Sequence, residues 1–298
     1  MKAACILIFA LWLASPALAA TNAPVLQGDG VCRFILHDYP LTKTNEAVIN
    51  FVVTDLLKRH ERAFDFNART NLRVVIRIFG RFDDFRDHIR SNSDGFGELP
   101  SSMEITNLAG VYSIRDREVV TWRQHDPAYF ANNLLHECSH AIMNQQFRVL
   151  PLWVMEGTAE FFSFPQYMRD AKDQRRLMGR WLQLKESLDN GSLPRLEEFL
   201  KTSDTEFRAM KPEQSYLASW SLIQFFQSNA ANRKALNDMI RALQRPDVTL
   251  ADCPKLLARG YAGGLAKMEK DWHAWITRGA ASVLQSLQKP KTQQPGTR

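Results

Sequence analysis

Cysteine is scarce in this chain, and no apolar stretch beyond the first twenty residues is long enough to span a bilayer. The 298 residues include four Cys, 14 Gly and 13 Pro, and 45% of them are hydrophobic. This composition excludes a disordered or collagen-like chain. The length excludes a mini-protein held together by disulfides, and it is enough for one large domain or two closely packed lobes.

Neither sign of charge dominates the sequence. The chain has 38 Lys and Arg against 32 Asp and Glu, a formal net charge of +6. Basic and acidic residues are interleaved, as in Arg115-Asp116-Arg117-Glu118, which is typical of solvated charged faces. The pattern therefore does not indicate a nucleic-acid partner, although modest basicity can favour anionic surfaces or acidic substrates.

The first twenty residues have the pattern of a secretory signal peptide. Lys2 is followed by an apolar run from Ala3 to Ala14 and by a small-residue cleavage site ending at Ala19. An uncleaved membrane anchor is the alternative, but the run is shorter than the roughly 18 residues that a spanning helix requires. We expect cleavage, no transmembrane segment afterwards, and a soluble protein exported to the periplasm or the cell surface.

Three cysteines remain after cleavage: Cys32, Cys138 and Cys253. In an oxidising compartment an odd number leaves at least one of them unpaired. Cys138 lies among the apolar positions of a predicted helix and is expected to face the core. Cys32 and Cys253 are then the expected disulfide pair if their Cα atoms come within roughly 7 Å, and three free thiols are the alternative.

The sequence predicts an α+β fold in which a small N-terminal lobe with a mixed sheet (21–125) precedes a larger helical lobe (126–288). The expected elements of the first lobe are an extended segment at 33–36, a helix around 46–57, a strand at 72–79 with Arg73 and Arg77 outward, a helix at 82–89, and a hairpin of 111–114 and 118–122.

Helices are expected throughout the second lobe. The first begins at the cap Asp126-Pro127, and the second opens at Pro151 and closes at Pro165. Further helices are expected at 169–188, 196–200, 214–228, 232–243 and 265–287. The polar tail at 289–298 is expected to be disordered.

The first long helix of this lobe carries His136-Glu137-Cys138-Ser139-His140, an H-E-x-x-H motif. Helix residues four positions apart lie about 5–6 Å from each other, so the two imidazoles can hold one Zn²⁺. Glu137 is offset from them, near the water on the metal, which is the position of a general base. Two ordinary surface histidines are the alternative.

A third metal ligand is expected sixteen residues after His140. Glu156 stands in an apolar run, PLWVMEGTAEFF, where an ionised carboxylate without a partner is costly, and coordination to zinc would remove that cost. Gly157 and Ala159 are small enough for this second helix to pack tightly against the first. Glu160, one turn later, can accept a hydrogen bond from the second ring nitrogen of a ligand His.

With these motifs the chain resembles the gluzincins, metallopeptidases in which the two His of H-E-x-x-H and a downstream Glu bind zinc. The P-x-W-x-x-E-G-x-A-E-F-F run resembles the peptidase MA-like bacterial envelope proteins, many of them known only as a domain of unknown function. The resemblance covers residues 132–164 and, more weakly, 110–216. It implies a zincin-like active-site helix between the two lobes.

Carried over to this chain, the resemblance implies one Zn²⁺ held by His136, His140 and Glu156, with Glu137 as the general base. Thermolysin-like members have an Asp where this chain has Glu160. The expected hydrogen bond between Glu160 and a ligand His therefore departs from their pattern.

Two further features follow from the resemblance. Gluzincins commonly stabilise the oxyanion with a Tyr or His of the helical lobe, and Tyr216 opens a helix at a similar place, a half-buried aromatic being the alternative. They also place an edge strand that pairs with substrate where this chain has Gly110–Ser113. The aminopeptidase signature G-x-M-E-N is absent, which leaves an endopeptidase or a narrow-specificity hydrolase.

The other five histidines lack paired spacing and are expected at the surface: His37, His60, His88, His125 and His273. His125 stands out because it lies two residues before the motif helix.

The sequence thus predicts an exported zinc metallopeptidase that hydrolyses a peptide or protein substrate through a metal-activated water. The alternatives are a zinc-binding envelope protein that has lost turnover and a metal-free helical scaffold. The intact Glu137 favours the enzyme, since a purely structural site does not require a base.

Overall fold

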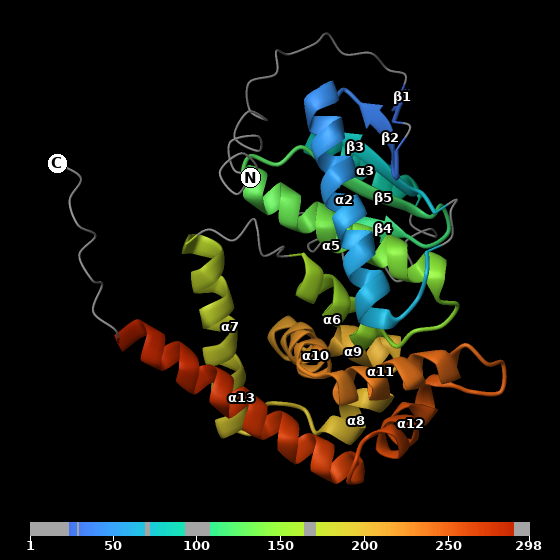
Figure 1. Cartoon of the computed structure of the whole chain (residues 1–298). Helices are drawn as coiled ribbons and strands as arrows, with labels where there is room; N and C mark the ends of the chain where they lie inside the picture. Colours follow the sequence, from blue (N-terminus) through green and yellow to red (C-terminus); the bar gives the residue numbers. More distant parts are fainter. Residues whose placement is uncertain (1–23, 29, 69–71, 93–107, 164–170, 289–298) are drawn as a thin grey trace. The chain divides into compact units, whose positions relative to one another are not determined.

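The computed structural model describes residues 24–28, 30–68, 72–92, 108–163 and 171–288. The expected signal peptide, the helix end at Pro165, the helix start at 169 and the expected tail lie outside these residues. The fold is α+β, as predicted, with an open five-stranded mixed sheet near the N-terminus and helices in the remainder (Figure 1).

The N-terminal part contains the sheet and three of the described helices. The strands are β1 (Val25–Gln27), β2 (Cys32–His37), β3 (Val74–Phe79), β4 (Gly110–Ser113) and β5 (Glu118–Trp122). The helices are α2 (Lys43–Phe64), α3 (Phe82–Ser91) and α5 (Pro127–Gln146).

The strands are ordered β1-β2-β3-β5-β4. β2, β3 and β5 run parallel to one another, whereas β1 pairs with β2 and β4 pairs with β5 in antiparallel fashion. The predicted hairpin is therefore confirmed as β4 and β5, and its turn places Arg117 in the left-handed region at φ 55°. The hairpin leaves β4 at one end of the sheet.

Side chains alternate between the two faces of the sheet, and each face has its own helices. Tyr112 of β4 points to α5, where its hydroxyl donates a hydrogen bond to Asn144 Oδ1 at 3.2 Å. Its neighbour Val111 points the other way, against the apolar cluster formed with α3 by Phe79, Phe85, Ile89 and Val120. α2 packs against α5. The sheet thus has α2 and α5 on one face and α3 on the other.

The two long helices begin at side-chain caps. Thr42 Oγ1 accepts a hydrogen bond from the Asn45 amide at 3.2 Å at the start of α2. Asp126 accepts from the Ala128 amide at 2.9 Å, and Pro127 occupies the first turn of α5. The predicted start of the motif helix is confirmed, because both signals are local.

The remaining elements are helical. They are α6 (Leu152–Phe162), α7 (Ala171–Asp189), α8 (Leu196–Lys201), α9 (Asp204–Ala209), α10 (Pro212–Gln227), α11 (Ala230–Leu243), the 3₁₀ turn η4 (Leu250–Asp252), α12 (Cys253–Gly260) and α13 (Gly264–Gln288).

Contacts divide the chain into two compact units at a different place from the predicted boundary. The sheet unit extends to Leu150 and includes α6 from Thr158 onward, whereas Pro151–Gly157 and the helices from α7 onward form the helical unit. The boundary expected at 125 and 126 therefore falls inside the sheet unit. The physical reason is that α5 packs on β3, β4 and β5.

The helical unit has an aromatic core. The Trp272 indole is fully buried in α13, and its Nε1 donates a hydrogen bond to Ser221 Oγ of α10 at 3.1 Å. The Trp181 ring lies 4.5 Å from the Trp275 ring, centroid to centroid. These contacts join α7, α10 and α13.

The three cysteines of the described residues are free, so the expected bridge between Cys32 and Cys253 is wrong. Each of the two side chains is fully buried within its own unit, Cys32 in β2 and Cys253 at the start of α12. Burial raises the pKa of both thiols, that of Cys253 to about 12, which keeps them protonated and unreactive.

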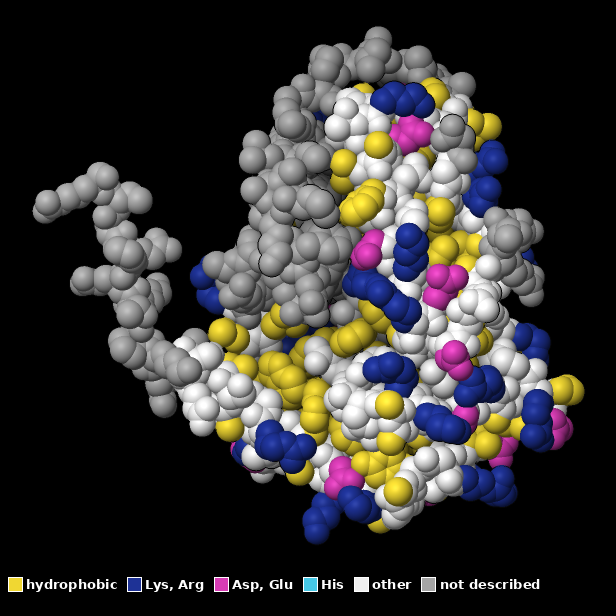
Figure 2. Space-filling model, viewed as in Figure 1, with side chains coloured by type: hydrophobic (Ala, Val, Ile, Leu, Met, Phe, Trp, Pro, Cys, Tyr) yellow, Lys and Arg dark blue, Asp and Glu magenta, His cyan; other side chains and the backbone are white. Residues whose placement is uncertain are grey.

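Charges of both signs are scattered over the face of the described residues that Figure 2 shows. Among the described residues, ion pairs one helical turn apart are common, as between Lys185 and Asp189 or between Lys234 and Asp238. None of the described helices has both the length and the apolarity to cross a membrane.

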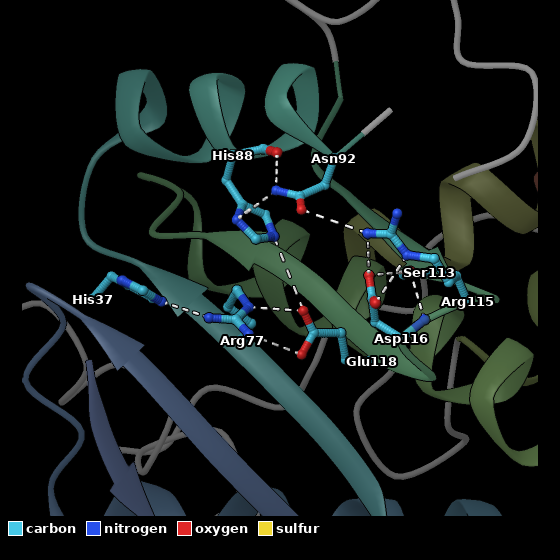
Figure 3. Close-up of polar contacts among 8 residues, drawn as sticks. All are labelled: His37, Arg77, His88, Asn92, Ser113, Arg115, Asp116 and Glu118. Carbon is cyan, nitrogen blue, oxygen red and sulfur yellow. Dashed lines mark hydrogen bonds and ion pairs between the residues drawn. The ribbon is translucent and has the colours of Figure 1, made fainter. Parts of the chain in front are cut away.

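A polar cluster lies on the face of the sheet that α3 covers (Figure 3). The buried Glu118 carboxylate accepts hydrogen bonds from Arg77 Nε at 2.8 Å and Nη2 at 3.1 Å. Arg77 Nη1 lies 2.8 Å from His37 Nε2, and His88 Nε2 lies 3.9 Å from Glu118 Oε1. Arg77, expected to face outward, is only partly exposed, because its guanidinium is held by this carboxylate.

Both histidines of the cluster are half-buried rather than exposed. Burial, followed by the positive charge of Arg77, lowers the pKa of His37 and that of His88. The folded chain therefore holds these imidazoles neutral at a pH at which the unfolded chain protonates them.

We predict that replacing both His37 and His88 with Gln makes the stability less sensitive to acid. A lowered folded pKa means that the native state binds fewer protons, so stability is full above the unfolded value near 6.5 and falls as the pH drops below it. Urea unfolding between pH 7 and pH 5 should show a smaller loss of free energy for the double variant than for the wild type. The exposed His125→Gln should keep the wild-type loss, and equal losses in all three chains would contradict the prediction.

Candidate metal centre

The H-E-x-x-H motif lies on α5 with its two imidazoles beside each other. The ring centroids of His136 and His140 are 4.8 Å apart, with the rings almost perpendicular at 84°. One ligand atom from each histidine and one carboxylate oxygen of Glu156 all lie within 4.8 Å of one another. Among the described residues, these three side chains could hold a metal ion, and they are called the metal group below.

Glu156 reaches the group from α6, which follows α5 after a short connection. The helix begins just after Pro151, whose carbonyl accepts from the Val154 amide at 2.9 Å. Its neighbours Trp153 and Ala159 are almost completely buried, and Glu156 itself is only 7% exposed. An ionised carboxylate at this depth requires a positive charge or strong donors nearby.

Glu160 lies one turn further along α6 and faces the first histidine. Its Oε1 is 3.4 Å from His136 Nδ1, and both side chains are partly buried. This is the arrangement in which a carboxylate orients a ligand imidazole and leaves Nε2 for the metal. The predicted acceptor thus lies next to Nδ1, the second ring nitrogen of His136, even though it is Glu and not Asp.

Glu137 is also buried, with 6% of its surface exposed. It follows His136 on α5 and precedes Cys138, which is fully buried, as predicted. Burial raises the pKa of Cys138 well above its usual range, so its thiol remains protonated and does not compete as a ligand.

The small residue after Glu156 serves a different contact from the one expected. A Cβ at Gly157 would lie 2.7 Å from the carbonyl carbon of Ser219 and 2.8 Å from Ile223 Cγ1, and it would overlap the Ser219 carbonyl oxygen. Both residues belong to α10. Gly157 therefore lets α6 approach α10 of the helical unit, and the expectation that it packs against α5 is wrong.

Tyr216 lies in the first turns of α10, which begins at Pro212. Its ring is half-buried and 5.8 Å from the Phe207 ring of α9. Its role at an oxyanion stays a prediction.

Sequence reasoning missed one histidine that contacts the motif. His60 of α2 is fully buried, and its Nε2 lies 2.8 Å from Ser139 Oγ. The expectation of a surface position is wrong for His60, whereas His125 is exposed as expected. The available signal was the apolar pattern of its helix face, which also carries Leu56, Ala63 and Phe64. Apolar neighbours at these spacings indicate a buried position.

Residues 131–247 match the model of a family described as "Protein of unknown function (DUF1570)". The matched segment includes His136, His140 and Glu156 on α5 and α6 and continues through α11. No curated protein matches the chain.

We predict that Gly157→Ala destabilises the chain. The added methyl group meets backbone atoms of α10 that cannot rotate away, and overpacking of this kind costs about 1–3 kcal/mol. The matched control is Gly179→Ala on α7, where a Cβ meets nothing within 4 Å. That change should be neutral or stabilise by about 0.4–1 kcal/mol, because Ala restricts the unfolded chain. Urea unfolding measures both, and equal stability of the two variants would contradict the close approach.

Proposed function

We propose that this chain is an exported zinc-dependent metallopeptidase of the gluzincin type. The observation that carries the proposal is the convergence of His136, His140 and Glu156 within 4.8 Å. Two imidazoles and one carboxylate are the protein ligands of a catalytic zinc with a fourth position left for water or substrate.

The donors fit zinc in their chemistry as well as in their number. Nitrogen and carboxylate ligands suit zinc, and the carboxylate of Glu160 beside His136 supplies the outer contact that such ligands usually have. When bound, zinc supplies a Lewis acid that polarises a carbonyl and makes water reactive near neutral pH. His136, His140 and Glu156 would hold the ion.

In this proposal Glu137 is the general base. Its carboxylate follows the first proposed ligand on α5 and is buried. Glu137 would accept the proton of the attacking water and pass it to the leaving amine. Tyr216 would donate a hydrogen bond to the oxyanion.

The position of β4 at one end of the sheet supports the proposal of a peptide or protein substrate. β4 is the last strand of the order and pairs with β5 on one side. The contact between Tyr112 and Asn144 anchors β4 to α5, the helix with both histidines. An extended substrate could add to β4 as a further strand, which would align its backbone with the motif.

Export to the periplasm or the cell surface is proposed from the signal-like first twenty residues. No nucleic-acid partner is proposed, because basic and acidic residues are interleaved along the chain.

The first test is metal content. Purified wild type should bind one zinc per chain, and His140→Ala should weaken binding by more than the roughly 10- to 100-fold that is typical for loss of an outer partner. His125→Ala, which removes an exposed histidine before α5, should bind zinc like the wild type. Metal analysis and titration with a chromophoric chelator measure this, and equal zinc content in wild type and His140→Ala would remove the basis of the proposal.

The second test separates an enzyme from a zinc-binding protein that has lost turnover. On a library of quenched fluorescent peptides, Glu137→Gln should lower the rate by roughly 10²- to 10⁴-fold, the contribution of a general base, and should leave the zinc content unchanged. Glu197→Gln, an exposed change on α8, is the control. Wild-type turnover in Glu137→Gln would refute the mechanism. A zinc-loaded wild type that cleaves no member of the library would favour a zinc-binding protein that has lost turnover.

A further inference from the structure

His60 is fully buried in α2, and both of its ring nitrogens are engaged. Nδ1 lies 2.8 Å from the Leu56 carbonyl oxygen, and Nε2 lies 2.8 Å from Ser139 Oγ. A carbonyl oxygen can only accept, so Nδ1 carries the proton in the neutral ring, and Nε2 accepts from the Ser139 hydroxyl. Burial lowers the pKa of His60 to about 3, which keeps this one tautomer in place at neutral pH.

Ser139 lies inside the metal-binding motif, directly before His140. Its side chain is fully buried and turned to α2, whereas the neighbouring imidazole belongs to the metal group. Successive helix residues are about 100° apart around the axis, since one turn takes 3.6 residues. A hydrogen bond that fixes Ser139 therefore also fixes the rotation of α5 that aims His140.

The same histidine contacts the second helix of the site. The His60 ring lies 4.3 Å from the Phe162 ring at the end of α6, and the Arg59 guanidinium lies 5.4 Å from that ring. Phe162 is two residues beyond Glu160, which faces His136. α2 thus contacts both of the helices that carry the metal group through neighbouring residues of one turn.

We propose that His60 is a positioning residue that sets the geometry of the metal group by joining α5 and α6 to α2. This proposal rests on the proposed zinc function. Ligands must be held within about 0.5 Å of their productive places, and residues behind the ligands provide that precision. A core histidine that contributes only packing would stabilise the fold and leave the metal affinity unchanged, so the two roles differ in a measurable way.

The experiment compares Ser139→Ala with Ser221→Ala in the full chain. Each change removes a fully buried serine hydroxyl that is hydrogen-bonded to an aromatic ring nitrogen, His60 Nε2 in one case and Trp272 Nε1 in the other. Both variants should lose some thermal stability. The zinc Kd is measured by chelator competition well below the melting temperature. It should rise roughly 10-fold in Ser139→Ala, the lower end of the range for losing a group that supports a metal ligand, and it should stay within about two-fold in Ser221→Ala.

A second pair of variants changes the histidine itself. His60→Leu fills much of the buried space with an apolar side chain but removes the acceptor, and it should raise the zinc Kd by roughly 10- to 100-fold. His60→Gln can place an amide oxygen near the position of Nε2, so it should recover most of that loss. Recovery of zinc affinity by Gln supports a hydrogen bond to Ser139, which packing alone does not explain.

The outcomes separate this proposal from the proposed function. An unchanged zinc Kd in both Ser139→Ala and His60→Leu, with lower melting temperatures only, would overturn the positioning role and leave the zinc site intact. Absence of zinc from the wild-type chain would overturn the proposed function and this proposal with it.

Discussion

Two carboxylates, those of Glu137 and Glu156, are placed where only 6% and 7% of their surfaces remain exposed. An ionised carboxylate at such depth is tolerated only beside a positive charge or several strong donors. For Glu156, the two imidazoles of α5 and the ion that they could bind meet this requirement. α5 and α6 come close enough that one nitrogen of each histidine and one carboxylate oxygen of Glu156 lie within 4.8 Å of one another.

The sheet unit acts as the support for α5. Gly110 lies so close to this helix that a Cβ would be 2.6 Å from Asn133 Oδ1, and Tyr112 donates to Asn144 one turn beyond the motif. His60 contacts the helix between these two points. A helix held at several positions along its length rotates little, and ligands on such an element are placed more precisely than ligands on a loop.

α6 is constrained by its small and aromatic residues. Gly157 allows a backbone of α10 to approach the helix, and Phe162 packs against the ring of His60. The polar cluster on the other face of the sheet obeys the same rule as the metal group, since the buried Glu118 is paired with the guanidinium of Arg77. Glu118 thus lies beside a guanidinium, and Glu156 beside two imidazoles.

The local features of the site could be predicted from the sequence alone. The spacing of His136 and His140 on one helix, the cap at Asp126 and the buried position of Glu156 depend on residues close together in the chain, and the α+β class and the hairpin follow from patterns of the same short range. For this reason these expectations agree with the structure.

The tertiary structure alone decided the contacts between distant parts of the chain. His60 and Ser139 are 79 residues apart in sequence, and Arg77 and Glu118 are 41 apart. The expected place of His60 at the surface was wrong for that reason, as was the expected partner of Gly157. Which side chains meet across such distances depends on how helices and strands pack, and a hydrophobic pattern shows which face of an element is buried but not which residue lies against it.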